Sequence, residues 1–176
     1  MKKIALLSVL SVMAISSANA ATGTITITGE IQASSCVINN EPATNESATN
    51  FNVELPTVSA TDLAAANKTA GLTLFNINVT QCPEENVSVS FSSANANDAG
   101  RLNTTGDATN VDVQLVNSKL QAINLNDDVV SQTNGAWVNT GEAGTATLTY
   151  GAQYFATGAA SVGSVGTTVE YTVVYQ

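Results

Sequence analysis

The fold is decided by the last stretch of the chain, Val169-Glu170-Tyr171-Thr172-Val173-Val174-Tyr175-Gln176. Apolar residues occupy the odd-numbered positions, and mostly polar residues lie between them. In an extended chain this period of two places the apolar side chains on one face. The pattern therefore predicts a half-buried antiparallel β-strand that ends almost at the last residue.

The same alternation recurs upstream, in residues 24–28, 72–79, 87–91, 111–115 and 146–150. Good turn formers separate these segments, among them Asn126-Asp127-Asp128, Asn134-Gly135 and the polar connection over residues 93–106. Only residues 58–68 could form a helical turn. Several short strands joined by polar turns predict an all-β, immunoglobulin-like β-sandwich.

The first twenty residues have the pattern of a signal peptide. A basic start precedes the mostly apolar residues 4–15, and Ala18-Asn19-Ala20 supplies the small residues of a cleavage site. This apolar run is too short to cross a bilayer, which needs about twenty residues. We expect export and cleavage before Ala21, which leaves about 156 residues, enough for one domain with a real core.

Cys36 and Cys82 are the only cysteines in the chain. In an oxidising compartment a single pair is most simply a disulfide. Neither a histidine nor a basic neighbour lies near them to favour a reactive or metal-binding thiol pair. We therefore expect one disulfide.

The composition disfavours several classes of function. Fourteen acidic residues against three basic ones, Lys68, Arg101 and Lys119, give the mature chain a net charge of −11. So few cations cannot neutralise a row of phosphates, which makes nucleic acid and anionic membranes poor partners. The chain has no histidine, which removes imidazole catalysis and His-based metal sites. We expect no catalytic residue, no metal site and no cofactor.

The carboxylates do not change this expectation. Asp127-Asp128 and Glu84-Glu85 lack the spacing and the glycine of a calcium loop. No pair of acids can be placed from sequence at the separation that glycoside hydrolysis needs. A secreted hydrolase is therefore the least favoured class.

The beginning of the mature chain is patterned like its end. Polar residues there alternate with a small or apolar set: Gly23, Ile25, Ile27, Gly29 and Ile31. Two strongly patterned termini leave little room for frayed ends. From the pattern alone, two ordinary strands closing one sandwich remain as good an interpretation as a special role for these ends.

Four motifs follow one another along the mature chain. Ile27-Thr28-Gly29-Glu30-Ile31 comes first, and Cys36-Val37-Ile38 follows it. Residues 72–82 lead to the second cysteine, and residues 150–158 read Tyr-x-Ala-x-Tyr-x-Ala-Thr-Gly, well before the penultimate Tyr175. In order and spacing these motifs resemble subunits of chaperone–usher fimbriae, the type 1-like pilins. The resemblance covers nearly the whole mature chain.

The resemblance implies an incomplete sandwich that lacks its last strand. It implies a signal peptide over residues 1–20, a donor-strand extension over residues 21–31 and a pilin domain over residues 32–176. The missing strand would leave an apolar groove beside the C-terminal strand. A periplasmic chaperone would fill this groove first, and the extension of another subunit would fill it in the fibre.

The resemblance also assigns roles to residues. The donor strand would insert the set from Gly23 to Ile31 named above. The groove and chaperone-binding residues would be Val169, Tyr171, Val173, Tyr175 and Gln176. The terminal carboxylate of Gln176 would meet basic residues of the chaperone.

The expected function is therefore structural: an exported, non-enzymatic subunit that polymerises head to tail into a surface fimbria supporting adhesion. Its expected partners are neighbouring subunits, a periplasmic chaperone and an outer-membrane usher, with a host receptor reached only through the fibre. A monomeric exported carbohydrate-binding sandwich, with Trp137 or Tyr154 stacking on a sugar, is the alternative.

Overall fold

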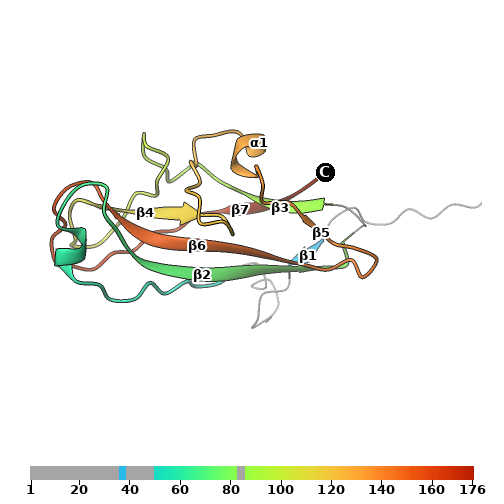
Figure 1. Cartoon of the computed structure of the whole chain (residues 1–176), viewed down its shortest axis with the longest axis horizontal. Helices are drawn as coiled ribbons and strands as arrows, with labels where there is room; N and C mark the ends of the chain where they lie inside the picture. Colours follow the sequence, from blue (N-terminus) through green and yellow to red (C-terminus); the bar gives the residue numbers. More distant parts are fainter. Residues whose placement is uncertain (1–35, 39–49, 83–85) are drawn as a thin grey trace, which may run out of the picture. The chain divides into compact units, whose positions relative to one another are not determined.

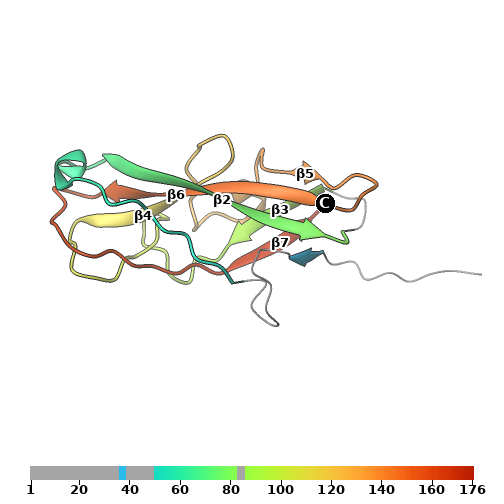
Figure 2. The same ribbon diagram turned by 90° about the horizontal axis from the view of Figure 1, so that it is seen from below.

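The computed structural model describes residues 36–38, 50–82 and 86–176. Two antiparallel sheets are present (Figures 1 and 2). The first sheet has the order β1 (Val37–Ile38), β2 (Thr69–Thr80), β6 (Ala146–Ala156), β4 (Val111–Val116). The second sheet has the order β5 (Val138–Asn139), β3 (Asn86–Phe91), β7 (Tyr171–Tyr175). The sequence prediction of an all-β sandwich is confirmed.

Five of the patterned segments form strands, with some differences at their ends. β2 and β6 extend beyond the alternating residues, and β7 begins at Tyr171 rather than at Val169 as the pattern predicted. The amide of Ser92 still donates to the carbonyl of Glu170 at 2.9 Å, but the carbonyl of Thr168 accepts from the Asn95 side chain at 3.0 Å. The chain before β7 is thus held by the loop around Asn95 instead of by β3. The segment of residues 24–28 lies outside the described residues.

The described part also contains two short helices. The 3₁₀ helix η1 (Ala60–Leu63) lies within the predicted helical turn, and Ser59 begins it with a capping box that includes Asp62. The single-turn helix α1 (Val129–Gln132) was not predicted. Its N-cap is Asp128, whose carboxylate accepts from the Ser131 amide at 2.8 Å, a bond that lowers the pKa of Asp128. No helix in this part of the chain is long and apolar enough to cross a membrane.

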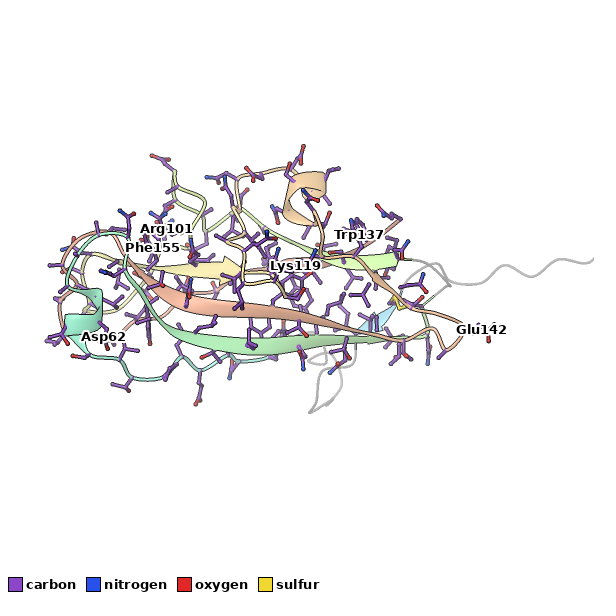
Figure 3. The ribbon with its side chains drawn as sticks, in the orientation of Figure 1. Asp62, Arg101, Lys119, Trp137, Glu142 and Phe155 are labelled. Carbon is purple, nitrogen blue, oxygen red and sulfur yellow. A yellow bond between two sulfur atoms is a disulfide. The ribbon has the colours of Figure 1, made fainter. Side chains whose placement is uncertain are left out.

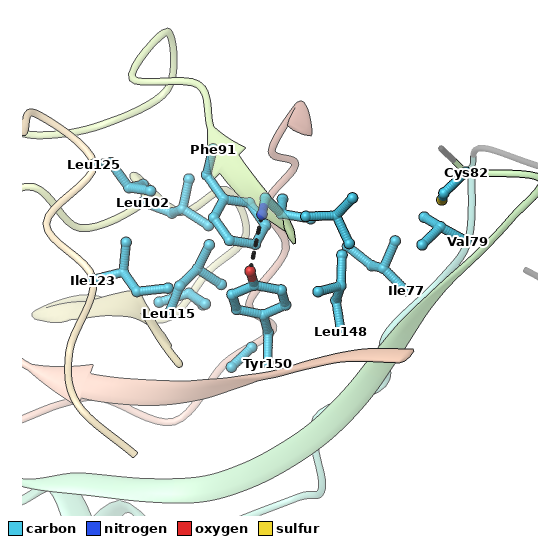
Figure 4. Close-up of a cluster of buried hydrophobic side chains, with 14 residues drawn as sticks. Ile77, Val79, Cys82, Phe91, Leu102, Leu115, Ile123, Leu125, Leu148 and Tyr150 are labelled. Carbon is cyan, nitrogen blue, oxygen red and sulfur yellow. Dashed lines mark hydrogen bonds between the residues drawn. The ribbon is translucent and has the colours of Figure 1, made fainter. Parts of the chain in front are cut away.

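A single large cluster of buried side chains fills the space between the sheets (Figure 4). Tyr150 on β6 lies at its centre, with its ring edge-on to Phe91 at a centroid distance of 5.1 Å. The Tyr150 hydroxyl accepts from the Val89 amide of β3 at 3.1 Å and lies 3.4 Å from the Ser88 hydroxyl. One phenol thus joins the two sheets through the core.

The predicted disulfide is present between Cys36 and Cys82. Cys36 directly precedes β1, and Cys82 follows β2 by two residues, so the bond reinforces the pairing of these two strands. The disulfide closes a loop of 46 residues. On the chain-entropy model a loop of that length stabilises the folded state by about 4 kcal/mol.

Replacing Tyr150 by Phe should lower the free energy of unfolding by about 1–2 kcal/mol. The substitution keeps the ring but leaves the buried Val89 amide without its acceptor. Denaturant unfolding of the purified proteins checks this. Tyr154→Phe is the matched control, since Tyr154 is only half-buried and its hydroxyl makes no hydrogen bond within the described part of the chain. An unchanged midpoint for Tyr150→Phe would contradict the prediction.

Stability should also fall in alkaline solution. Burial raises the pKa of Tyr150 above its ordinary value of 10.0, so the folded state favours the neutral phenol. This contribution is fully present below the ordinary pKa and is lost as the pH rises above it. The unfolding midpoint should therefore drop above about pH 10, and less steeply in Tyr150→Phe. Equal alkaline losses in both proteins would show that Tyr150 is not responsible.

Candidate functional site: the open edge of the C-terminal strand

β7 lies at one end of the second sheet. β3 is its partner, and no other strand in the described part of the chain pairs with it. Two hydrogen bonds just beyond the end of the strand define its register against β3. The Asn86 amide donates to the Gln176 carbonyl at 3.2 Å, and the Gln176 amide donates to the Asn86 carbonyl at 3.0 Å. Alternate residues of an antiparallel strand bond to the same neighbour. The backbone amide and carbonyl of Val174 therefore point toward β3, and those of Val173 and Tyr175 point toward the open edge.

The side chains on the inner face of β7 are incompletely covered. Val173 and Tyr175 are half-buried, whereas Ile77 and Val79 of β2 are only 0 % and 1 % exposed. Other half-buried apolar residues pack against the same cluster: Cys36, Ile38, Phe51, Leu55, Phe75, Val165, Val169 and Tyr171. The core is therefore closed in its centre and only partly closed by the side chains of β7.

An aromatic side chain reaches away from each end of β7. Near its start, the rings of Tyr171 and Phe51 lie edge-on at 6.0 Å, and Phe51 in turn lies 5.7 Å from Phe75 of β2. Near its end, the Tyr175 hydroxyl accepts from the Cys36 amide at 2.9 Å. The N-terminal part of the domain is thus tied to β7 at two points, while β1 pairs with β2 and not with β7.

A polar depression lies beside α1, and two side chains that line it, Gln132 and Asn117, form hydrogen bonds to the backbone of the chain. The Gln132 side chain accepts from the Phe91 amide at 2.9 Å and donates to the Asp127 carbonyl at 2.9 Å. Asn117 bonds to the amides of Lys119 and Gln121. These hydrogen bonds fix the loops around the depression. Among the described residues, no three His, Cys, Asp or Glu side chains are grouped to hold a metal ion.

The two aromatic residues of the carbohydrate-binding alternative lie in different places. Trp137, labelled in Figure 3, is half-buried. With Val130 and Val174 it lines a shallow, mostly apolar pocket of about 240 Å³. Tyr154 packs against a second small cluster that contains Leu63 and Val111. They do not form one sugar-stacking platform.

Comparisons with known proteins agree with this architecture. Residues 55–176 match the family model described as "FimA: Type-1 fimbrial protein, A". The chain is 40 % identical over 165 residues to the major fimbrial subunit SMF-1 of Stenotrophomonas maltophilia, covering 90 % of this chain and 95 % of that protein.

The chain belongs to the type-1 fimbrial protein family. It is also 37 % identical to the F17 fimbrial protein of Escherichia coli, covering 97 % of each chain. The P pilus rod subunit PapA shares the fold with a TM-score of 0.58 at 14 % identity, covering 80 % of this chain and 99 % of that one. The chain is therefore a structural pilin of the chaperone–usher type that is exported to the cell-surface fimbria, and its fold is the incomplete immunoglobulin-like sandwich of these subunits.

The site residues predicted from the sequence fall into two groups. The structure brings Tyr171, Val173 and Tyr175 together on β7, with Val169 two residues before the strand and Gln176 directly after it. The predicted donor residues, Gly23, Ile25, Ile27, Gly29 and Ile31, lie outside the described residues.

Sequence reasoning missed two residues that pack against the same core as β7. Phe51 and Leu55 are half-buried against the main cluster. Phe51-Asn52-Val53-Glu54-Leu55 has the same period of two as the recognised strands and could have identified them.

Removing the disulfide should lower the free energy of unfolding by about 4 kcal/mol or somewhat less. The double variant Cys36→Ser/Cys82→Ser leaves the core side chains in place and only opens the loop. Denaturant unfolding of the subunit, with and without reductant, measures the effect. The reductant should destabilise the natural chain to the level of the variant and leave the variant unchanged; a natural chain indifferent to reduction would contradict the assignment.

Proposed function

We propose that the open edge of β7 receives residues 21–31 of another copy of this chain, so that subunits join head to tail. The observation that carries the proposal is the unpaired edge of β7, where the backbone groups of Val173 and Tyr175 face outward beside half-buried apolar side chains. Donor-strand complementation in chaperone–pilin complexes is a known form of β-strand addition. On this proposal residues 1–20 are removed and residues 32–176 form the accepting domain.

The chemistry of the proposed donor matches that of the acceptor. An added strand would gain main-chain hydrogen bonds from the outward amides and carbonyls of β7. Its alternate side chains, Ile25, Ile27 and Ile31, would cover the partly closed core, each contributing about 2–3 kcal/mol before ordering costs. Gly23 and Gly29 would fit where little depth is available.

The acceptor residues have separate tasks on this proposal. Val169, Tyr171, Val173 and Tyr175 would contact the inserted side chains, and Val173 and Tyr175 would also bond its backbone. The carboxylate of Gln176, the last residue, would pair with a basic group of the partner that occupies the edge before assembly.

That earlier partner is a periplasmic chaperone, and an outer-membrane usher is where the exchange takes place. An exposed strand edge beside apolar side chains is prone to aggregate, so an exported subunit needs temporary cover. On this proposal the chain has no catalytic role, and a host receptor is bound only by the assembled fibre.

Two substitutions of the same chemistry on opposite faces test the donor assignment. Ile27→Asp should stop polymerisation, because it places a charge where an apolar side chain must be buried. Thr28→Asp is the matched control, since Thr28 alternates with Ile27 and should face away from the core. Electron microscopy of cells that express each variant with its chaperone and usher counts the fibres.

The acceptor domain must remain intact for this test to be informative. Both variants should therefore still co-purify with the chaperone, because their accepting domains are unchanged. Fibres of normal number and length from Ile27→Asp would overturn the proposal, as would fibres from a chain that lacks residues 21–31.

A further inference from the structure

We propose that Val162, at the tip of the loop before β7, docks into the apolar pocket beside Trp137 of the next subunit in the fibre. The loop is called here the docking loop and consists of residues 157–168. This inference rests on the proposed function, because it concerns how two subunits already joined by a donor strand pack against one another. The contact would fix the angle between successive subunits.

The receiving surface, called here the indole pocket, is open and apolar. Its walls are formed chiefly by Val129 and Val130 of α1, by Trp137 and by Val174 of β7. Val130 is 78 % exposed although its side chain is apolar. The Thr133 hydroxyl, which also lines the pocket, already donates to the Val129 carbonyl at 2.8 Å. A hollow with such walls is suited to an apolar group of a partner.

The docking loop presents an apolar side chain from a fixed backbone. Val162 is 83 % exposed, more than any other large hydrophobic residue in the described part of the chain. Beside it, the Ala108 amide donates to the Ser164 carbonyl at 3.1 Å. Gly163 lies so close to this neighbour that a Cβ atom there would be 2.4 Å from the Ala108 amide nitrogen. The tip is therefore a projection held against the rest of the domain.

Val162 cannot reach the indole pocket of its own chain. The Ala160 amide donates to the Leu63 carbonyl of η1 at 3.0 Å, which holds the docking loop near the start of β2. The indole pocket includes Tyr175, which bonds to Cys36 near the other end of β2. Twelve residues at about 3.3 Å each make β2 about 40 Å long. Figure 1 shows η1 and the C-terminus in different halves of the domain. A second copy must supply the valine.

The proposed donor extension brings the right surfaces together. Every pair of strands in the described residues is antiparallel. A donor strand that follows this pattern places its last residue, Ile31, beside Tyr171 at the start of β7, next to the docking loop. Five residues separate Ile31 from Cys36 of the donating domain, a distance of at most about 18 Å. The end of the donating domain that carries the indole pocket is thus held close to the docking loop of the accepting domain.

The other exposed large hydrophobic residues fit the pocket less well. Outside the pocket they are Val37, Leu72, Leu74, Leu120 and Val138. All except Leu120 lie within strands, where a side chain on a sheet surface does not project as a loop tip does. Leu120 lies in a turn, but the neighbouring Asn117 and Gln121 line the depression that α1 itself borders. Val162 alone among them lies in a loop at the other end of the domain.

The donor strand makes a small contact sufficient. The indole pocket has a volume of about 240 Å³, several times the roughly 30 Å³ that one water molecule occupies in the liquid, so it admits the isopropyl group of a valine. Because the donor strand already joins the two subunits, the contact forms at a high effective concentration. Two different surfaces meet in it, as the contacts of a head-to-tail polymer require.

The first test uses Trp137, the only tryptophan of the chain, as a probe. Fibres are purified from cells that express the natural chain, Val162→Asp or Leu74→Asp with chaperone and usher. Leu74→Asp is the matched control, because Leu74 is 55 % exposed and lies within β2. Acrylamide should quench Trp137 less in natural and Leu74→Asp fibres than in Val162→Asp fibres. Should Val162→Asp not assemble, Val162→Ala provides the same comparison with a smaller change.

The second test identifies the neighbour by cross-linking. Both natural cysteines form the disulfide, so added cysteines are the only free thiols. In fibres of Val162→Cys/Val130→Cys, a short bis-maleimide should join successive subunits into ladders that survive boiling in detergent. Val162→Cys/Leu120→Cys is the matched control, since it has the same number of exposed thiols but none in the pocket, and it should form no ladder.

Equal quenching of Trp137 in natural and Val162-variant fibres would overturn the inference. So would fibres of Val162→Cys/Val130→Cys that form no ladder, or equal ladders from both cysteine pairs. Shielding of Trp137 in the chaperone complex that persists in Val162-variant fibres would show that another partner fills the pocket, which also overturns it. Absence of fibres from the natural chain would instead contradict the proposed function.

Discussion

The structure depends on the pairing of β7, which among the described strands bonds only to β3 and only along one edge. β3 satisfies the inward-facing half of its backbone groups, and the groups of Val173 and Tyr175 point the other way. A buried or half-buried strand with unpaired amides and carbonyls is costly, and water or another strand must satisfy them. The side chains of Val173 and Tyr175 on the inner face of β7 are half-buried.

Contacts elsewhere in the domain stabilise the core and hold β7 in place. Tyr150 joins the two sheets through the middle of the core, and the disulfide reinforces the pairing of β1 with β2. Tyr175 and Tyr171 tie the two ends of β7 to Cys36 and Phe51. These contacts fix both ends of β7 within the domain.

Much of this could be predicted from the sequence, because period-two alternation is a direct consequence of strand geometry. It identified β2, β3, β4, β6 and β7, and export made the disulfide of Cys36 and Cys82 the simplest pairing. The ends of the strands were harder to predict. β7 starts at Tyr171, for example, because the side chain of Asn95 bonds to the backbone that precedes it. Helix α1 was missed because an N-cap such as Asp128 resembles an ordinary turn residue.

The open edge of β7 can be tested most directly by residue-resolved hydrogen–deuterium exchange, comparing assembled fibres with the chaperone-free subunit. The amide of Val174, which faces β3, should be protected in both. The amides of Val173 and Tyr175 should exchange rapidly in the free subunit and become protected in fibres, because the added strand bonds them there. Equal protection of these two amides in both states, whether high or low, would contradict the account.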